Sequence, residues 1–316
     1  MAEPAHELWE RRYEDWLHYL NEVIRVVESG RKIPLGPSRE APEPPVPPKV
    51  TAAAAPPPKI VYCAPHPDDE SLSGALALRL RLESAAKVTV AAITLGRKRP
   101  ERQRRLRELE SACRSLEFRL VVPNSPEGLE NVNLESRKAR PEEWAASVRV
   151  LREIFDREEP DAVFTPHAED FNTTHIGTHH LALEALGEHL ERKARGPMLL
   201  IETEFWRPMA APNLMLGVAP ELAARQLIAA TEHGGEMTRN PYHLLHPCRL
   251  MDNVRRGSEV VGGQGAAAQP FPFAELYRVS FMKGRQVIEP SPGGRIAGPE
   301  EKIDLAWLNT QFAPEG

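Results

Sequence analysis

The sequence has few cysteines and no long apolar segment. Its three cysteines lack C-x-x-C spacing and are too few for a disulfide framework, so we interpret Cys63, Cys113 and Cys248 as buried free thiols. No apolar run approaches the roughly 18 residues needed to cross a bilayer. The charged, aromatic N-terminus does not resemble a secretion signal. These absences predict a cytoplasmic protein without a membrane span.

The sequence also lacks a large excess of one charge. A net charge of −5 over 316 residues gives no overall attraction to nucleic acid or to an anionic membrane. The composition, with 41% hydrophobic and 27% charged residues, is close to that of globular proteins. We therefore expect most of the chain to fold around a core, and we expect no nucleic-acid partner.

Three segments differ in composition. Residues 1–33 contain a predicted amphipathic helix, because apolar side chains recur at steps of three and four over residues 3–29. This helix either docks on its own chain or forms a homo-oligomer contact. Residues 34–58, rich in proline and alanine, predict an extended linker or surface strap. Residues 59–316 are the predicted folded domain.

Strands and helices alternate from Lys59 onward. The sequence pattern predicts strands at residues 59–65, 87–95, 119–123 and 161–166, and helices at 72–82, 101–118, 145–160 and 180–195. The connections are too long for hairpins, so they indicate an α/β fold with a mostly parallel sheet and helices on both faces. Ligands of such sheets bind beyond the carboxyl ends of the strands. Candidate site residues are therefore sought at 65–74, 96–102 and 166–180.

One imidazole and three carboxylates follow the first predicted strand, in Pro65-His66-Pro67-Asp68-Asp69-Glu70. A capped helix with solvated acids needs only one of these carboxylates. Carboxylates placed this close together repel one another unless a cation neutralises them. Histidine and aspartate are both zinc ligands, so the segment predicts a site for a divalent metal.

A second polar cluster follows the fourth predicted strand, where residues 165–180 contain four histidines. His175 and His179 are four residues apart and would share one face of a helix. Either could supply a third ligand and leave a fourth zinc position open for water, as in catalytic sites. The position of His180 is that of an ordinary helix residue. His167 could instead donate a hydrogen bond within its loop.

Together the two clusters resemble the PIG-L/LmbE family of zinc-dependent N-deacetylases. The family motif A-H-P-D-D-E appears as residues 64–70 with an extra proline, and Gly74 stands where the family has glycine. The second motif, D-x-H-P-D-H, aligns with residues 170–175. Arg105 and Glu108 match the R-x-x-E spacing, and His233 matches a late histidine. The resemblance covers about residues 59–235.

The resemblance implies a Rossmann-like fold and one Zn²⁺ per chain held by His66, Asp69 and His175. It implies hydrolysis of an N-acetyl group from an amino sugar such as N-acetylglucosamine or its conjugate, with Asp68 as the base for the zinc-bound water. Asn172 and Thr174 replace the family's histidine and aspartate that stabilise the oxyanion. Losing one such donor costs about 10²–10³ in rate. Asn172 could donate a neutral hydrogen bond, and His179 or His167 could complete the site.

Substrate contacts are expected from three further regions. The basic run at residues 97–107, with Arg97 and Arg99 at its start, indicates either a solvated face or a site for an anionic substrate group. Trp206 either packs in the core or stacks on a sugar ring, in a site that Glu204 and Asn213 could also line. Arg255 belongs to a polar, glycine-rich stretch at 253–265, interpreted as a loop near the site or a surface turn.

Three functions remain open from the sequence. The first is deacetylation of an N-acetylated sugar or conjugate. The second is zinc-dependent hydrolysis of a non-sugar N-acyl metabolite, which the altered second motif leaves possible. The third is a non-catalytic metal-binding interaction protein that works through its N-terminal helix and proline-rich strap. The intact acidic residues of the first motif favour an enzyme, because a site without chemistry has no need of Asp68.

Overall fold

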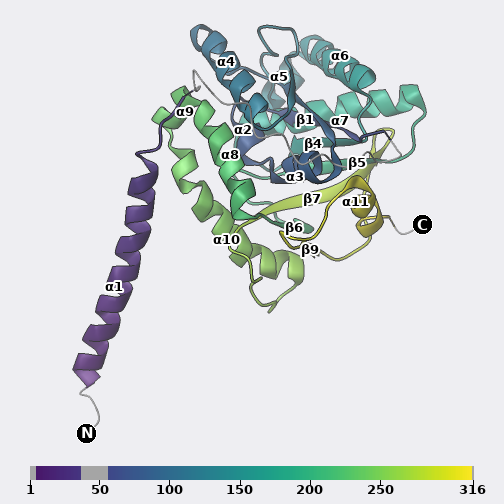
Figure 1. Cartoon of the computed structure of the whole chain (residues 1–316). Helices are drawn as coiled ribbons and strands as arrows, with labels where there is room; N and C mark the ends of the chain where they lie inside the picture. Colours follow the sequence, from purple (N-terminus) through teal and green to yellow (C-terminus); the bar gives the residue numbers. More distant parts are fainter. Residues whose placement is uncertain (1–4, 37–55, 315–316) are drawn as a thin grey trace.

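The apolar runs of the sequence form the centre of one sheet. The computed structural model describes residues 5–36 and 56–314, and within them the sheet has nine strands. Its strands are β1 (Lys59–Ala64), β2 (Lys87–Ala92), β3 (Arg119–Val121), β4 (Ala162–Pro166), β5 (Met198–Thr203), β6 (Leu214–Gly217), β7 (Ala274–Lys283), β8 (Gln286–Ile288) and β9 (Arg295–Ala297). The order along the sheet is β3-β2-β1-β4-β5-β7-β6-β9, with β8 paired to β7. Figure 1 labels β1, β4, β5, β7, β6 and β9 of this sheet.

Most of this sheet is parallel, as predicted. β3, β2, β1, β4 and β5 pair in parallel, whereas β7 runs antiparallel to both β5 and β6. After β1 the chain adds β2 and β3 on one side and then crosses to β4 on the other. β1 and β4 are therefore neighbours at the point where the strand order reverses, which is where α/β sheets bind their ligands.

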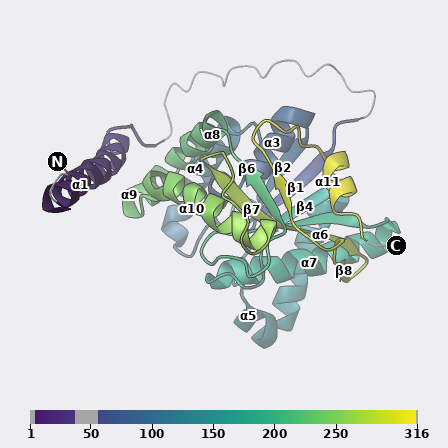
Figure 2. The same ribbon diagram turned by 90° about the horizontal axis from the view of Figure 1, so that it is seen from below.

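Helices cover both faces of the sheet (Figure 2). One face carries α3 (Ala75–Ser84), α4 (Arg99–Ser115), α8 (Pro220–Glu232) and α11 (Leu305–Gln311), whose apolar side chains pack on Ile60 and Tyr62 of β1. The other face carries α6 (Pro141–Glu158) and α7 (Thr173–Lys193), which pack on Val61 and Cys63. The side chains of β1 alternate between the two faces because a strand has a two-residue period. This arrangement confirms the predicted α/β class.

Two predicted helix boundaries are wrong. The helix predicted at 72–82 is two helices, α2 (Asp69–Leu72) and α3, separated at Gly74. A Cβ atom at position 74 would lie 2.1 Å from the carbonyl oxygen of Glu70, so only glycine permits this close approach. The helix predicted at 180–195 already begins at Thr173, because Asn172 caps it by accepting a hydrogen bond from the Thr174 amide at 2.9 Å.

The stretch around Arg255 is also corrected. It lies in a helix, α10 (Tyr242–Gly262), and the glycine-rich loop begins only at Gly263. Leu250, Val254, Gly257 and Val261 recur at helical spacing and face the sheet. Gly257 is needed for packing, since a Cβ atom there would lie 2.7 Å from the Leu276 side chain. The short helices α5 (Leu134–Ala139) and α9 (Gly234–Arg239) complete the described fold.

The N-terminal helix is confirmed as α1 (Ala5–Gly30), and it projects away from the sheet domain (Figure 1). Its C-terminal end contacts α10, and in the segment that follows it the Gly36 amide donates to the Thr231 carbonyl at 2.9 Å. Ile24 and Val26 remain exposed. The predicted linker at 34–58 falls mainly on residues 37–55, outside the described residues. No described helix combines the length and apolar character that crossing a bilayer requires.

Candidate metal centre

The two polar motifs meet at the carboxyl ends of β1 and β4. These strands are hydrogen-bonded neighbours in parallel register, with Ile60 opposite Ala162 and Tyr62 opposite Phe164. The first motif follows β1 directly and the second follows β4. Residues about 100 positions apart in the chain are thereby placed in one site.

His66, Asp69 and His175 form a compact cluster that could hold a metal ion. One potential ligand atom from each residue lies within 4.8 Å of the others. Oδ2 of Asp69 is 3.4 Å from Nδ1 of His66 and 3.3 Å from Nε2 of His175. His175 Nε2 is buried without a hydrogen-bond partner among the described residues, as expected for an atom reserved for a cation. The two imidazoles and one carboxylate fit a zinc site with an open position.

Asp170 orients His175 from behind. Its Oδ2 lies 3.5 Å from Nδ1 of His175, while its Oδ1 accepts a hydrogen bond from the backbone N–H of Asn172 at 2.8 Å. A carboxylate behind a ligand histidine fixes the tautomer and raises the basicity of the ring. Burial lowers the pKa of His175, but Asp69 and Asp170 outweigh it and raise that pKa to about 10. The same negative field favours a bound cation.

Asp68 is held in an unusual backbone conformation. Its φ of 120° is in the region that L-residues rarely adopt. The Asp68 amide donates to Oε2 of Glu70 at 3.0 Å. Glu70 is fully buried, and its Oε1 accepts from Ser71 Oγ at 2.9 Å and from Nε2 of His233 at 2.8 Å. The pair formed by Glu70 and His233, contributed by α2 and the end of α8, thus holds the backbone of the acidic motif.

A cleft with a volume of about 220 Å³ opens over the ligand set. It is lined by His66, Asp68, Asp69, Gly96, Arg97, Arg105, Asn172, His175, Phe205, Trp206, Glu236, Arg239 and Tyr242. Burial and the neighbouring Asp69 raise the pKa of Asp68. Arg105 donates to the Pro67 carbonyl at 3.2 Å, a position that the missing side chain of Gly96 permits. The cleft therefore combines three carboxylates with three guanidinium groups around the ligand set.

An aromatic wall forms one side of this cleft. The rings of Phe205, Trp206 and Tyr242 meet edge to face, with centroids 5.1 to 5.8 Å apart. Arg249 lies over the Phe205 ring at 5.1 Å. Trp206 is 42% exposed, so its ring is available to a ligand. Sequence reasoning missed Phe205, Arg239 and Tyr242, because only the fold brings these loop and helix ends to the motif.

The predicted site residues do not all reach the cleft. Asn172 does, while its Oδ1 is used as the cap of α7. His179 is buried with its Nδ1 2.9 Å from the Pro166 carbonyl, and it lines neither this cleft nor the larger cavity beside it. Arg255 is exposed, pairs with Asp252 at 2.8 Å and also lies outside the two cavities.

Glu204 and Asn213, which the sequence places beside Trp206, have structural roles. Glu204 is buried in an ion pair with Arg256, and the Asn213 amide bonds to the backbone of Val279 across the sheet. His167 donates from its Nε2 to the Arg207 carbonyl, 2.8 Å away. These contacts hold the end of β5 and the neighbouring loops in place, as a rigid scaffold for the aromatic wall requires.

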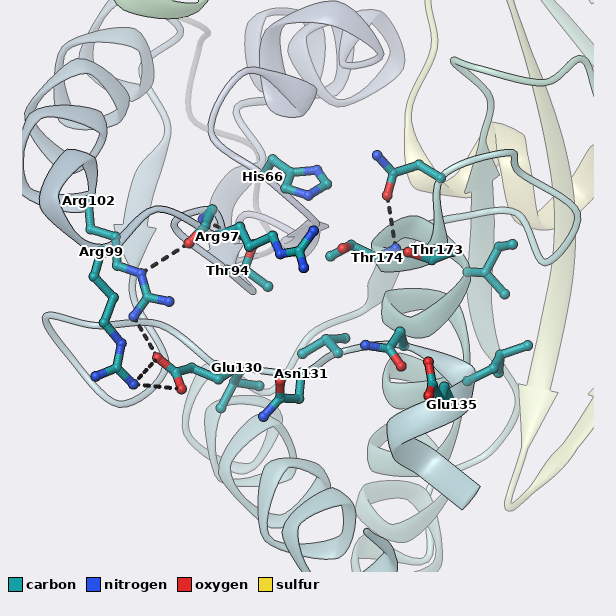
Figure 3. Close-up of a pocket in the computed structure, with 17 residues that line it drawn as sticks. His66, Thr94, Arg97, Arg99, Arg102, Glu130, Asn131, Glu135, Thr173 and Thr174 are labelled. Carbon is teal, nitrogen blue, oxygen red and sulfur yellow. Dashed lines mark hydrogen bonds and ion pairs between the residues drawn. The ribbon is translucent and has the colours of Figure 1, made fainter. Parts of the chain in front are cut away.

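A larger side cavity of about 610 Å³ adjoins the cleft. The two spaces share His66, Gly96, Arg97 and Asn172 in their linings. The side cavity continues between the loop after β2, the segment before α5 and the first turn of α7 (Figure 3). Arg99, a predicted substrate contact, lines this cavity, and its guanidinium bonds both carboxylate oxygens of Glu130, at 2.9 and 3.0 Å.

Residues 61–186 match the family described as PIG-L, GlcNAc-PI de-N-acetylase. No curated protein matches the chain. The matched segment contains both motifs and all three proposed metal ligands. It ends before the aromatic wall.

Solved structures with the same fold include proteins of different activity. A mutant of a deacetylase of teicoplanin biosynthesis is 16% identical, with a TM-score of 0.51 over 71% of this chain and 98% of its own. The N,N'-diacetylchitobiose deacetylase of Pyrococcus horikoshii is 16% identical, with a TM-score of 0.50 over 72% and 84%. GalB, the 4-carboxy-2-hydroxymuconate hydratase of Pseudomonas putida KT2440, is 16% identical, with a TM-score of 0.51 over 70% and 95%. At this identity the similarity establishes the fold.

Proposed function

Because residues 61–186 form a PIG-L family domain, a domain of hydrolytic N-deacetylases, we propose that this protein removes the acetyl group from an N-acetylated amino sugar or its conjugate. The observation that carries the proposal is the His66–Asp69–His175 set, placed beside the buried Asp68 at the floor of a cleft. The aromatic wall supports a sugar substrate, since sugar rings stack on exposed aromatic faces such as Trp206.

The ligand set favours zinc as the cofactor, one ion per chain, because two imidazoles and a carboxylate are the donors of catalytic zinc sites. When bound, zinc would polarise the amide carbonyl and lower the pKa of the water bound to it to near neutrality. His66, Asp69 and His175 would hold it, and Asp170 would keep the ring of His175 in the required orientation.

The chain itself supplies proton transfer and orientation. Asp68 takes the proton of the attacking water and passes it to the leaving amine, the role of a general base and then acid. Asn172 uses its Oδ1 to cap α7, which leaves its amide N–H groups for the oxyanion that develops on the acyl carbon. Phe205, Trp206 and Tyr242 hold the sugar and exclude water from one side.

The first test measures bound metal by mass spectrometry in protein purified without added zinc. We expect about one zinc per chain, lost in Asp69→Ala and in His175→Ala. His180→Ala is the matched control, because His180 is on the same helix as His175 but lines neither cavity. A wild-type protein that binds no zinc even after zinc is added back would contradict the proposal.

The second test measures acetate release from a panel of N-acetylated sugars and non-sugar N-acyl compounds. Release from sugars supports the proposed substrate class, and release only from non-sugar amides would replace it with the alternative amidohydrolase. Zinc binding with no hydrolysis of any amide would favour a non-catalytic protein. The predicted cytoplasmic location and the homo-oligomer contact through α1 stay predictions of the sequence.

A further inference from the structure

The helix α2, which carries the proposed ligand Asp69 at its first position, is followed by backbone that distant parts of the chain hold in place. A helix of four residues leaves its last carbonyls without donors from a following turn. The carbonyls of residues 71–73 instead accept hydrogen bonds, at 2.8 to 3.4 Å, from Tyr62 of β1, Gln226 of α8, Arg249 of α10 and Tyr277 of β7. The backbone that follows Asp69 is therefore fixed by these four side chains.

Arg249 joins this set to the aromatic wall. Its Nη1 donates to the Leu72 carbonyl at 2.8 Å, and its Nη2 donates to the Glu204 carbonyl, directly after β5, at 2.6 Å. The guanidinium also lies over the ring of Phe205, the next residue along the chain. Because the Phe205 ring meets both other rings of the wall edge to face, one side chain contacts both halves of the cleft.

The guanidinium group is suited to this bridge. Its N–H donors form a rigid planar fork, so the two bonds of Arg249 set the separation of the Leu72 and Glu204 carbonyls. Hydrogen bonds from an ionised donor are roughly twice as strong as neutral ones, and the planar face adds attraction to the Phe205 ring. Arg249 is half-buried, which limits competition from water for the same carbonyls.

Resting on the proposed deacetylase function, we infer that Arg249 is a positioning residue that holds the aromatic wall at a fixed distance from the proposed metal ligands. Hydrolysis requires the sugar on the wall and its acyl carbon over the ligand set at the same time. A displacement of about 1 Å between such groups costs about 10²-fold in rate. Arg249 lines neither the cleft nor the side cavity, so it acts through Leu72 and Phe205 and does not touch the substrate.

The test measures kcat, KM and metal content of Arg249→Met with an N-acetylated sugar that the wild-type protein hydrolyses. Methionine keeps an unbranched side chain but has no N–H donor and no charge. We expect kcat/KM to fall by about 10- to 100-fold while the metal is retained, because His66, Asp69 and His175 all remain. Arg249→Lys should recover only part of this loss, since an ammonium has no planar fork that spans both carbonyls.

Arg79→Met is the matched control. Arg79 of α3 also donates to the carbonyls of two segments, Gly217 and Gly298, at 3.2 and 3.1 Å, but at the ends of β6 and β9. We expect its KM to be unchanged. The loss in Arg249→Met should include a higher KM, whereas a smaller folded fraction would lower kcat alone. An unchanged KM in Arg249→Met, or an equal rise of KM in Arg79→Met, would overturn the inference.

A double-mutant cycle with Trp206→Ala tests whether Arg249 acts through the wall. Trp206→Ala removes the exposed ring that the bridge positions. The double variant should then lose little more kcat/KM than the more damaged single variant, because the effects of coupled residues are not additive. Losses that multiply would show that Arg249 acts elsewhere, and the inference would then be wrong.

A measurement without substrate separates this inference from the proposed function. Quenching by acrylamide reports how accessible Trp206 is, and the contribution of Trp206 is the difference between a protein and its Trp206→Phe form. We expect that contribution to increase in Arg249→Met and not in Arg79→Met, because the wall loses its anchor. If the wild-type protein hydrolyses no amide, the proposed function fails. Quenching then decides the inference, since an increased contribution of Trp206 supports it and an unchanged one refutes it.

Discussion

Replacement of His233 tests whether the strained backbone of Asp68 is held by the buried pair beneath it. Holding an L-residue at the φ of 120° seen for Asp68 costs on the order of 1–3 kcal/mol. The hydrogen bond from the Asp68 amide to the Glu70 carboxylate, 3.0 Å long, is of a kind that contributes about 1.5–3 kcal/mol. The two magnitudes are similar, so the conformation depends on Glu70 staying in place.

His233 fixes Glu70 through the 2.8 Å bond from Nε2 to Oε1. In His233→Ala the carboxylate loses this donor, and we expect the base to leave its productive conformation part of the time. If returning Asp68 to its productive conformation costs about 1.5–3 kcal/mol in each turnover, kcat falls by about 10- to 100-fold. KM and metal content should change little, because the ligand Asp69 is held separately by the His66 amide at 2.9 Å.

Steady-state deacetylation with metal analysis is the assay, and two variants make it specific. His233→Gln keeps an N–H donor and should regain part of kcat. His189→Ala is the matched control: His189 is also fully buried and 2.8 Å from a carboxylate, that of Asp156, but it lies outside both site cavities. The reasoning is refuted if His233→Ala lowers kcat no more than His189→Ala does, at a temperature where circular dichroism shows both folded.

Three further results are expected. Asp68→Ala should keep its metal and lose about 10²–10⁴ in kcat, whereas His66→Ala should lose both metal and activity; mass spectrometry and acetate release separate these outcomes, and an active Asp68→Ala would exclude this base. Asn172→Ala should lower the free energy of unfolding by about 1 kcal/mol through loss of the α7 cap, measured by urea unfolding, and Asn172→Asp should restore most of it. Burial raises the pKa of Glu202 from 4.5 to about 7, so the folded protein keeps a proton that the unfolded chain releases, and stability falls as pH rises between these values. In urea unfolding, the free energy of unfolding of Glu202→Gln relative to that of wild type should rise by up to about 3 kcal/mol as the pH increases from 4.5 to 7.5. If the free energies of unfolding of the two proteins change with pH in parallel, Glu202 has no such effect.

The central strands and the positions of the two polar motifs were predictable from sequence because their signals are local. β1, β2 and β4 are short apolar runs, and each polar motif directly follows one of them. Parallel strands bring such motifs together at one edge of the sheet. These local signals left the third ligand open between His175 and His179, and the resemblance to the PIG-L/LmbE family selected His175.

The start of α7 was missed because Thr173 and Thr174 are β-branched residues that lower helix propensity, and their neighbour Asn172 is equally common in loops. The N-cap formed by Asn172 fixes the start of α7, and this hydrogen bond can be recognised only in the structure. The last strands and α10 were missed for a related reason. β6 and β9 are short, and Pro247 lies inside α10, where sequence rules favour a helix end.

Local sequence patterns do not reveal contacts between segments that are far apart in the chain. The Glu70–His233 pair and the aromatic wall are both built from such contacts. His233 could be aligned with a family histidine, but its partner was visible only once α8 was placed beside α2. Tyr242 and Trp206, 36 positions apart, meet because β5 ends and α10 begins near the same edge of the sheet.

The division of the cleft between two stretches of chain has an evolutionary consequence. The proposed metal ligands and Asp68 lie between residues 66 and 175, while the aromatic wall consists of Phe205, Trp206 and Tyr242. Mutations of these three rings can change which molecule is held without altering the groups proposed to act on the amide. Such a protein can drift between substrates while keeping its reaction, and exchanging the three rings for the residues of a relative would be a direct way to re-target it.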